Sequence, residues 1–424
     1  MIIKSLLAPS LAVLLCGCVD KHKSGTEGQV SSLIMNLTAP AADALGTPMV
    51  PVDVKQATFD IQAVDDQDQP ITSDLDVQLF LSFGGVKTGT TSMCGSDSPD
   101  KDPIETIHLP GGQVLNHTVA LPVAFGATSL WLDELTSHAT GASNNIYFRN
   151  PFVTDVQTPP DLTAANATFC TPFNGKFIIV DQPAMSTGKL VVSSVFGDAF
   201  VITDTSFGKY DAFNSIYLYA FGKPPPEIVP GKVLTSFSGN VSKFVGFTEL
   251  NFPLFSEADV SIPLEPLSPP VVVTQSDIAT PIHLLSLDAG VVVFTAVQCD
   301  PFPPNPTSDA TIQQTRDQWT KFNEYVMSTD GTCDSFTSFA IQLPGKLLGT
   351  FDPLMNVGKT IAVTGMLRNN SGQNLVLDAN KMPIDCDPVN TPCVTGTCIE
   401  AQCKKGAFNF WTINPRTPTD VSVQ

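Results

Sequence analysis

Residues 231–251 read GKVLTSFSGNVSKFVGFTELN, and they decide the fold of the chain. The segment contains two runs rich in β-branched and aromatic residues, 231–241 and 244–251, and such runs form strands. Three shorter predicted strands precede it, separated by turn residues: 190–195, 199–204 and 215–221. Five short strands at this spacing predict a small all-β domain within residues 187–285.

Four pieces of sequence carry a resemblance to a known family. They are GDAFVITD (197–204), NSIYLYAF (214–221), VPGKVLTSFSGNVSKFVGFTEL (229–250) and, further on, LLSLDAGVVVFTAV (284–297). Together they resemble the OB-fold modules of large secreted bacterial nucleases. The resemblance implies a five-stranded barrel with an accessory binding role. Those nucleases use a separate catalytic domain, and its histidine and acidic motifs are missing from this chain.

A second, degenerate copy of the module follows, which predicts another OB-like barrel in residues 286–424. Residues 357–365 (VGKTIAVTG) parallel residues 229–239 (VPGKVLTSFSG). The remaining strands expected in this copy are 289–297, 335–343, 373–379 (in the place of 246–251) and the closing strand 408–414.

Two insertions are expected within this second copy. Residues 308–327 have the periodicity of an amphipathic helix, with Trp319, Phe322 and Val326 on one face. Residues 385–405 form a cysteine-rich loop that is too polar to make a core without cross-links.

The region before the barrels, residues 30–180, is predicted to be an immunoglobulin-like β-sandwich. Its clearest strands are 57–64 and 77–83, and turns of Gly, Pro, Asp and Asn separate the others. The acidic turn at Asp65, Asp66 and Asp68 has two readings, a calcium loop or a solvated hairpin. It lacks the glycine and the later glutamate of a known calcium loop, which favours the hairpin.

The first 17 residues read as a signal peptide, because the apolar core from Leu6 to Leu15 is too short to span a bilayer. The segment ends Leu15-Cys16-Gly17-Cys18, which resembles the lipobox of bacterial lipoproteins. The resemblance implies that the Cys18 sulfur receives a diacylglycerol and that several acyl chains anchor the protein to a membrane. Residues 18–29 would then form a polar tether.

The same resemblance bears on location. In enterobacterial lipoproteins, aspartate directly after the lipidated cysteine favours the inner membrane. Here that position is Val19, with Asp20 one place later. We therefore expect a protein of the cell envelope that is lipid-anchored to the outer membrane, facing the periplasm or the cell surface.

The charge of the chain makes an ordinary nucleic-acid binder an unfavourable interpretation. The formal net charge is -19 and the pI is about 4.4, so the overall field repels phosphate groups. The partners that we expect are the membrane, which the protein would contact through its lipid, and either a polysaccharide or a surface protein.

Eight cysteines remain of the total of 10 when Cys16 and Cys18 are set aside: Cys94, Cys170, Cys299, Cys333, Cys386, Cys393, Cys398 and Cys403. An even number in an exported chain predicts disulfides. Order along the chain suggests Cys94–Cys170, Cys299–Cys333 and two bridges among the last four. Zinc is the alternative for the last four, but there is no C-x-x-C pair and no nearby histidine.

No catalytic motif, metal-binding motif or cofactor motif occurs in the sequence. Tyr217 and Tyr219 share one strand face, and with Tyr210 they form the candidate ligand face, although core packing is the alternative. The leading hypothesis is therefore a lipid-anchored, non-enzymatic protein with a binding or surface-structural role. An accessory module that presents nucleic acid or polysaccharide to an enzyme, and a cryptic hydrolase, are the alternatives.

Overall fold

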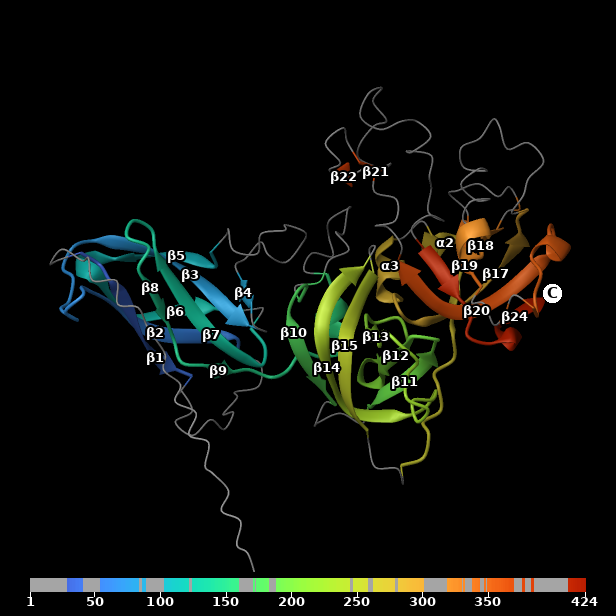
Figure 1. Ribbon diagram of the computed structural model, residues 1–424, viewed down its shortest axis with the longest axis horizontal. Coiled ribbons are helices and arrows are strands. Elements are labelled where there is room, and N and C mark those ends of the chain that lie inside the picture. Colours follow the sequence, from blue (N-terminus) through green and yellow to red (C-terminus); the bar gives the residue numbers. More distant parts are fainter. Residues whose placement is uncertain are drawn as a thin grey trace, which may run out of the picture.

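The computed structural model shows an almost entirely β protein built from three bodies in chain order: a sandwich and two barrels (Figure 1). It describes residues 29–40, 54–83, 86–88, 103–121, 124–159, 171, 173–182, 188–244, 247–257, 262–278, 281–300, 319–329, 331, 338–343, 347, 349–369, 376–377, 383–384 and 411–424. The signal peptide, Cys18, nearly all of the tether, the cysteine-rich loop and seven of the eight remaining cysteines lie outside these residues.

The N-terminal body is a two-sheet β-sandwich. One sheet has the order β1 (Ser32–Ala39), β2 (Gln56–Val64), β6 (Gln113–Ala120). The other has the order β4 (Val86–Thr88), β3 (Leu75–Phe83), β7 (Ala127–Glu134), β8 (Thr140–Ala142), with β5 (Glu105–Leu109) on β3 and β9 (Ile146–Tyr147) on β7. Taking β1, β2 and β6 as strands A, B and E, and β3, β7 and β8 as C, F and G, the order is immunoglobulin-like.

Buried and more exposed residues alternate along the strands, and the buried set forms the core of the sandwich. Phe59 and Ile61 on β2 point inward and meet Leu79, Leu130 and Leu132 from the facing sheet, and all five are buried. The predicted acidic turn is a hairpin turn, in which the Asp65 carboxylate accepts the backbone N–H groups of residues 67 and 69.

The boundary between the sandwich and the first barrel lies earlier than residue 180, which corrects the prediction. The strand expected near 176–180 does form, as β10 (Phe177–Asp181), but it pairs with β14 of the barrel. Its inward residues Ile178 and Val180 are buried in the barrel core, and so are Val153 and Val156 of α1 (Val153–Gln157). The segment after residue 150 therefore packs with the barrel.

Barrel 1 consists of the five strands predicted from the sequence: β11 (Leu190–Val195), β12 (Ala199–Asp204), β13 (Ser215–Tyr219), β14 (Val233–Phe244) and β15 (Phe247–Glu257). Each strand pairs with the next around a closed circuit, β11–β12–β13–β15–β14–β11. Only the β13–β15 pairing is parallel. This strand order is that of the OB-fold, a five-stranded Greek-key barrel.

Barrel 2 repeats the same circuit. Its strands are β17 (Val291–Gln298), β18 (Glu324–Ser328), β19 (Ser338–Gln342), β20 (Thr360–Asn369) and β23 (Trp411–Asn414). They close as β17–β18–β19–β23–β20–β17, again with only the third and fifth strands parallel. Two outer strands extend it: β16 (Val271–Val273) on β17 and β24 (Val421–Val423) on β20. Because of β16, barrel 2 begins before residue 286.

Two predicted elements of barrel 2 need correction. Residues 324–327, expected to end the helix, belong to strand β18, whereas residues 319–322 are helical and residues 308–318 lie outside the described residues. Tyr325 and Met327 alternate into the barrel core, so tertiary packing overrides the helical periodicity. Of the expected strand 373–379 the structure describes β21 (Val376–Leu377), which pairs with β22 (Pro383–Ile384), and β23 takes the place of the fifth barrel strand.

One glycine in each barrel supports the interpretation of a repeat. A Cβ atom on Gly239 would lie 2.8 Å from the carbonyl oxygen of Asn251, and one on Gly365 would lie 2.5 Å from that of Asn414. Both glycines lie on the fourth strand and both asparagines on the fifth. The close approach of the two strands therefore requires glycine at the same place in both copies.

Replacing either glycine with alanine should destabilise the protein, because a backbone carbonyl cannot move aside as a flexible side chain can. We expect Gly239→Ala and Gly365→Ala each to lower the free energy of unfolding by about 1–3 kcal/mol, as in other overpacked sites. Chemical denaturation followed by circular dichroism measures this. Gly197→Ala is the matched control, because its new Cβ would meet nothing within 4 Å. Equal stability of all three variants would contradict the close approach.

Candidate functional site

The outer face of β12 and β13 is the surface on which OB-folds bind their ligands, and here barrel 2 covers it. Phe200, Ile202, Ile216 and Leu218 point into barrel 1, so the alternate residues of these two strands point outward. The outward Val201 forms a fully buried cluster with Phe247, Ala289 and Met366, and Tyr217 packs against it. Ala289 and Met366 belong to the second half of the tandem. We call this contact the inter-barrel interface.

Polar groups on the same outer face are buried as well. The hydroxyls of Ser193, Thr203 and Ser215 form a row across β11, β12 and β13, with Oγ···Oγ distances of 3.0 and 2.9 Å. All three residues are buried. These three hydroxyls therefore bond to one another and are not available to a ligand.

The three tyrosines predicted to form a ligand face do not lie together. Tyr210 is only 2% exposed, because the loop between β12 and β13 reaches across to barrel 2. A Cβ atom on Gly290 would lie 2.9 Å from the Tyr210 Cβ, and Phe213 N–H donates to the Ser286 carbonyl oxygen at 3.0 Å. Tyr210 is thus an interface residue, which corrects the prediction for this position.

Tyr217 and Tyr219 share the outer face of β13, as expected, but they have different surroundings. The Tyr217 ring lies 5.0 Å from that of Phe247 at the inter-barrel interface, and burial raises the pKa of its hydroxyl. Tyr219 is half-buried, and its ring lies 4.3 Å from that of Phe221. Only Tyr219 therefore remains as a candidate for ligand contact.

Tyr219 begins a row of three rings that sequence reasoning missed. Phe221 stacks on Phe252 with a centroid distance of 4.4 Å and an interplanar angle of 12°. Phe221 is 53% exposed and Phe252 is 65% exposed. We call Tyr219, Phe221 and Phe252 the aromatic row. The sequence shows the rings, but the left-handed backbone and the strand bulge that bring them together leave no signal in it.

Ionisable side chains collect around Arg368 at the inter-barrel interface. The Arg368 guanidinium lies 4.9 Å from the ring centroid of Phe247, which is a cation–π contact. Its charge lowers the pKa values of Glu249 in barrel 1 and of Asp288 and Glu324 in the second half. Burial acts more strongly in the opposite direction on all three. One arginine of barrel 2 thus acts on two acids of its own half and, across the interface, on Glu249 of barrel 1.

The shifted pKa values follow from burial. Burial raises the pKa of Asp288 to about 7, against the opposing effects of an N–H donated by Asn369 (3.0 Å), Lys243 and Arg368. It raises the pKa of Glu324 to about 7, with Arg368 opposing. Burial lowers the pKa of Lys243 to about 7, and Asp288 opposes that shift. Glu249 has a raised pKa for the same reason, and its carboxylate accepts a hydrogen bond from Ser242.

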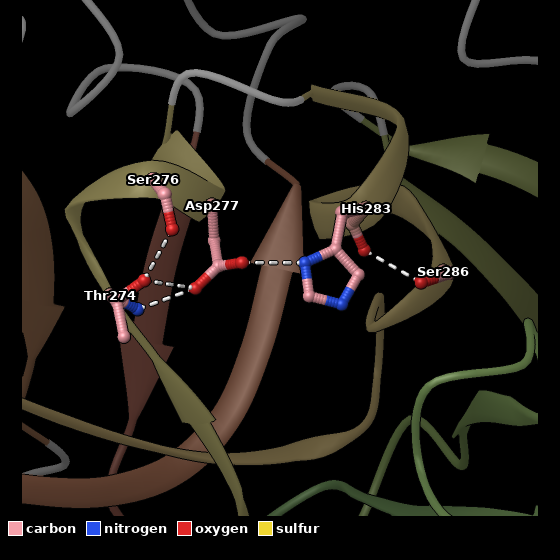
Figure 2. A network of polar contacts seen from close by, with 5 residues as sticks. All are labelled: Thr274, Ser276, Asp277, His283 and Ser286. Carbon is pink, nitrogen blue, oxygen red and sulfur yellow. Dashed lines mark hydrogen bonds and ion pairs between the residues drawn. The ribbon is translucent and has the colours of Figure 1, made fainter.

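A second polar network lies on the two short helices between β16 and β17, α2 (Gln275–Ile278) and α3 (Pro281–Ser286), and on Thr274 just before them (Figure 2). Asp277 accepts the N–H and the hydroxyl of Thr274 at 2.6 and 2.8 Å, and its other oxygen lies 2.7 Å from His283 Nδ1. Burial alone would raise the pKa of Asp277, but these partners lower it. The pattern is that of a capping box extended to a neighbouring helix.

Ser286, His283 and Asp277 have the residue types of a hydrolytic triad but not its geometry. Ser286 Oγ donates to the backbone carbonyl of His283 at 2.7 Å, as Figure 2 shows, whereas a triad serine bonds to the imidazole. Within the described ranges, no group of three or more His, Cys, Asp or Glu residues is placed to hold a metal ion.

Cys299 takes part in a disulfide, as predicted, and packs against Val326. Its partner lies outside the described residues, so the expected pairing with Cys333 stays a prediction. None of the helices in the described part of the chain is long and apolar enough to cross a membrane. Comparison of the chain with protein-family models, with curated proteins and with solved structures gave no match.

The buried acids should make stability depend on pH. Glu324 has a folded pKa of about 7 and an ordinary value of 4.5, so between these values the folded state holds a proton that the unfolded state has released. Stability therefore falls as pH rises through this window. We expect Glu324→Gln to remove about 1–3 kcal/mol of that fall.

Thermal unfolding at pH 5 and at pH 7.5 measures this effect. The difference between the two midpoints should be smaller in Glu324→Gln than in the unchanged protein. Asp66→Asn, at an exposed acid in the sandwich, serves as the control and should leave the difference unchanged. The same pH dependence in Glu324→Gln and in the unchanged protein would show that Glu324 ionises normally in the fold.

Proposed function

We propose that this protein is a lipid-anchored, non-enzymatic binding protein of the bacterial cell envelope. The lipobox-like residues 15–18 and the preceding apolar segment support export and lipidation of Cys18. The observation that carries the proposal for the body is the buried cluster of Val201, Phe247, Ala289 and Met366 at the inter-barrel interface, against which Tyr217 packs. Barrel 1 uses its ordinary OB ligand face to hold barrel 2.

This arrangement favours a binding role over the two alternatives. A module that presented a nucleic-acid strand on the OB face of barrel 1 would need that face open and positively charged, but it is covered and the chain carries a net charge of -19. A hydrolase would need a nucleophile beside a base, and Ser286 does not approach the His283 ring. Among the acids around Arg368, Glu249 belongs to barrel 1 and Asp288 to the second half of the tandem, so the cluster spans the contact between the barrels.

Lipidation is tested by growing cells that express the full chain with an alkyne-tagged fatty acid. We expect the label on the unchanged protein and on Cys16→Ser, because Cys16 would leave with the signal peptide. Cys18→Ser should lose the label and leave the membrane fraction. A labelled Cys18→Ser protein would refute the anchor assignment.

The non-enzymatic role is tested separately with the full chain purified in a non-ionic detergent. Single-stranded DNA and neutral polysaccharides are incubated with it, with and without Ca²⁺ and Mg²⁺, and product size is followed by electrophoresis and size exclusion. We expect every polymer to keep its length. Shortening that persists through purification and disappears on heat denaturation would show an enzyme.

A further inference from the structure

We propose that the aromatic row of Tyr219, Phe221 and Phe252 is a binding platform for a neutral polysaccharide. This inference rests on the binding role proposed above and names its ligand class. The row lies at the open end of the parallel β13–β15 pair, where Tyr219 is in register with Asn251. The OB face of the barrel is covered, so the platform would be a separate site on barrel 1.

The backbone holds two of these rings in an unfavourable conformation. Phe221 has a φ of 56° and Phe252 a φ of 54°, the left-handed region that bulky residues rarely adopt. Such conformations are energetically unfavourable for bulky residues and concentrate at functional sites. Here the strained backbone also exposes phenyl rings to solvent, and exposing this apolar surface is a second unfavourable contribution to the free energy of the fold. A structural role would favour the opposite, a buried ring on a relaxed backbone.

A strand irregularity places Phe252 in the row. The register between β14 and β15 shifts between Ser238/Leu254 and Asn240/Asn251, so residues 252 and 253 bulge out of the ladder. Bulges redirect side chains and are common beside binding sites. The bulge brings Phe252 against Phe221, which follows the last residue of β13 by two positions. Two separate strand ends thus converge on one stack.

The geometry of the stack selects a ligand with a flat apolar face. Phe221 contacts both Tyr219 and Phe252, and Phe252 is the more exposed of the two stacked phenyl rings (65% against 53%), so it offers the larger apolar surface to a ligand. The apolar face of a sugar ring can pack there. The exposed amide of Asn240, in register with Asn251, adds uncharged hydrogen-bonding groups next to the rings. Aromatic rings beside amides suit hydroxyl-rich, uncharged chains.

Charge separates this ligand from nucleic acids and from anionic lipid surfaces. A nucleobase would stack equally well, but its phosphates need lysine or arginine. Strands β13 and β15 contain neither residue, and β15 contributes Glu249 and Glu257. Lys223, two positions after Phe221, is exposed, but one lysine does not balance a chain of phosphates, and the acids of β15 and the net charge of -19 favour a neutral partner.

The test measures retardation of the purified full chain in native gels cast with one neutral polysaccharide each: a β-glucan, a galactomannan, a xylan or dextran. We expect at least one of them to retard the unchanged protein. Phe252→Ala should weaken that binding at least tenfold, and Phe252→Trp should retain it. Phe322→Ala is the matched control, because Phe322 is an exposed phenylalanine (48%) on the other half of the tandem.

Folding is followed in the same samples. Phe252→Asn removes the ring but introduces a residue that tolerates the left-handed region. This variant should therefore lose polysaccharide binding while its thermal unfolding midpoint stays as high as that of the unchanged protein. The platform is refuted if no polysaccharide retards the unchanged protein. It is also refuted if the Phe252→Ala variant binds a polysaccharide as tightly as the unchanged protein binds it. Phe252-dependent sedimentation with phosphatidylcholine vesicles, without retardation by any polysaccharide, would assign the row to a membrane surface instead. Shortened polysaccharide would overturn the proposed function and leave the platform intact.

Discussion

The packing of the second barrel onto the outer face of β12 and β13 is the constraint on which the rest of the structure depends. A five-stranded barrel fills its interior with its own side chains, so two such barrels can join only through their outer surfaces. Val201, Phe247 and Met366 make that contact apolar, and Arg368 places a charge at its margin. Because the contact covers the usual ligand face, anything that barrel 1 binds must bind elsewhere.

The ionic part of the interface fits this constraint. Buried acids are costly unless a positive charge stands nearby, and Arg368 is placed to serve acids from both halves. The arrangement resembles perturbed clusters in active sites, but its members come from different domains and hold them together. The perturbed ionisation of Glu249, Lys243 and Asp288 therefore accompanies the packing of one barrel on the other.

Much of the architecture could be predicted from the sequence, and particular residues explain why. All five strands of barrel 1 were predicted, because each is a short run rich in β-branched or aromatic residues and turn residues separate the runs. The repeat was visible through VGKTIAVTG and VPGKVLTSFSG, and the glycine that ends each of these motifs is Gly365 or Gly239. Strand β18 was missed because residues 319–326 also satisfy helical spacing, and the choice between the two depends on a barrel core assembled from distant strands.

The candidate site was harder to predict. Tyr217 and Tyr219 were correctly placed on one face, but whether a face is open depends on what packs against it, and barrel 2 is distant in sequence. Tyr210 was misassigned for that reason. The exposed rings of Phe221 and Phe252 depend on positive φ angles. A sequence predicts such angles at glycine or asparagine but gives no reason to expect them at phenylalanine.

Phe125 gives the junction between the sandwich and barrel 1 a mechanical character. It lies on the turn between β6 and β7 of the sandwich, yet it is buried in the barrel 1 core cluster, with its ring 5.1 Å from that of Phe173. A load applied to the sandwich would pass into the barrel through side-chain packing as well as through the backbone. The junction should therefore be rigid and should not act as a hinge. Exchanging the sandwich for another domain would remove Phe125 and leave a cavity in the barrel 1 core.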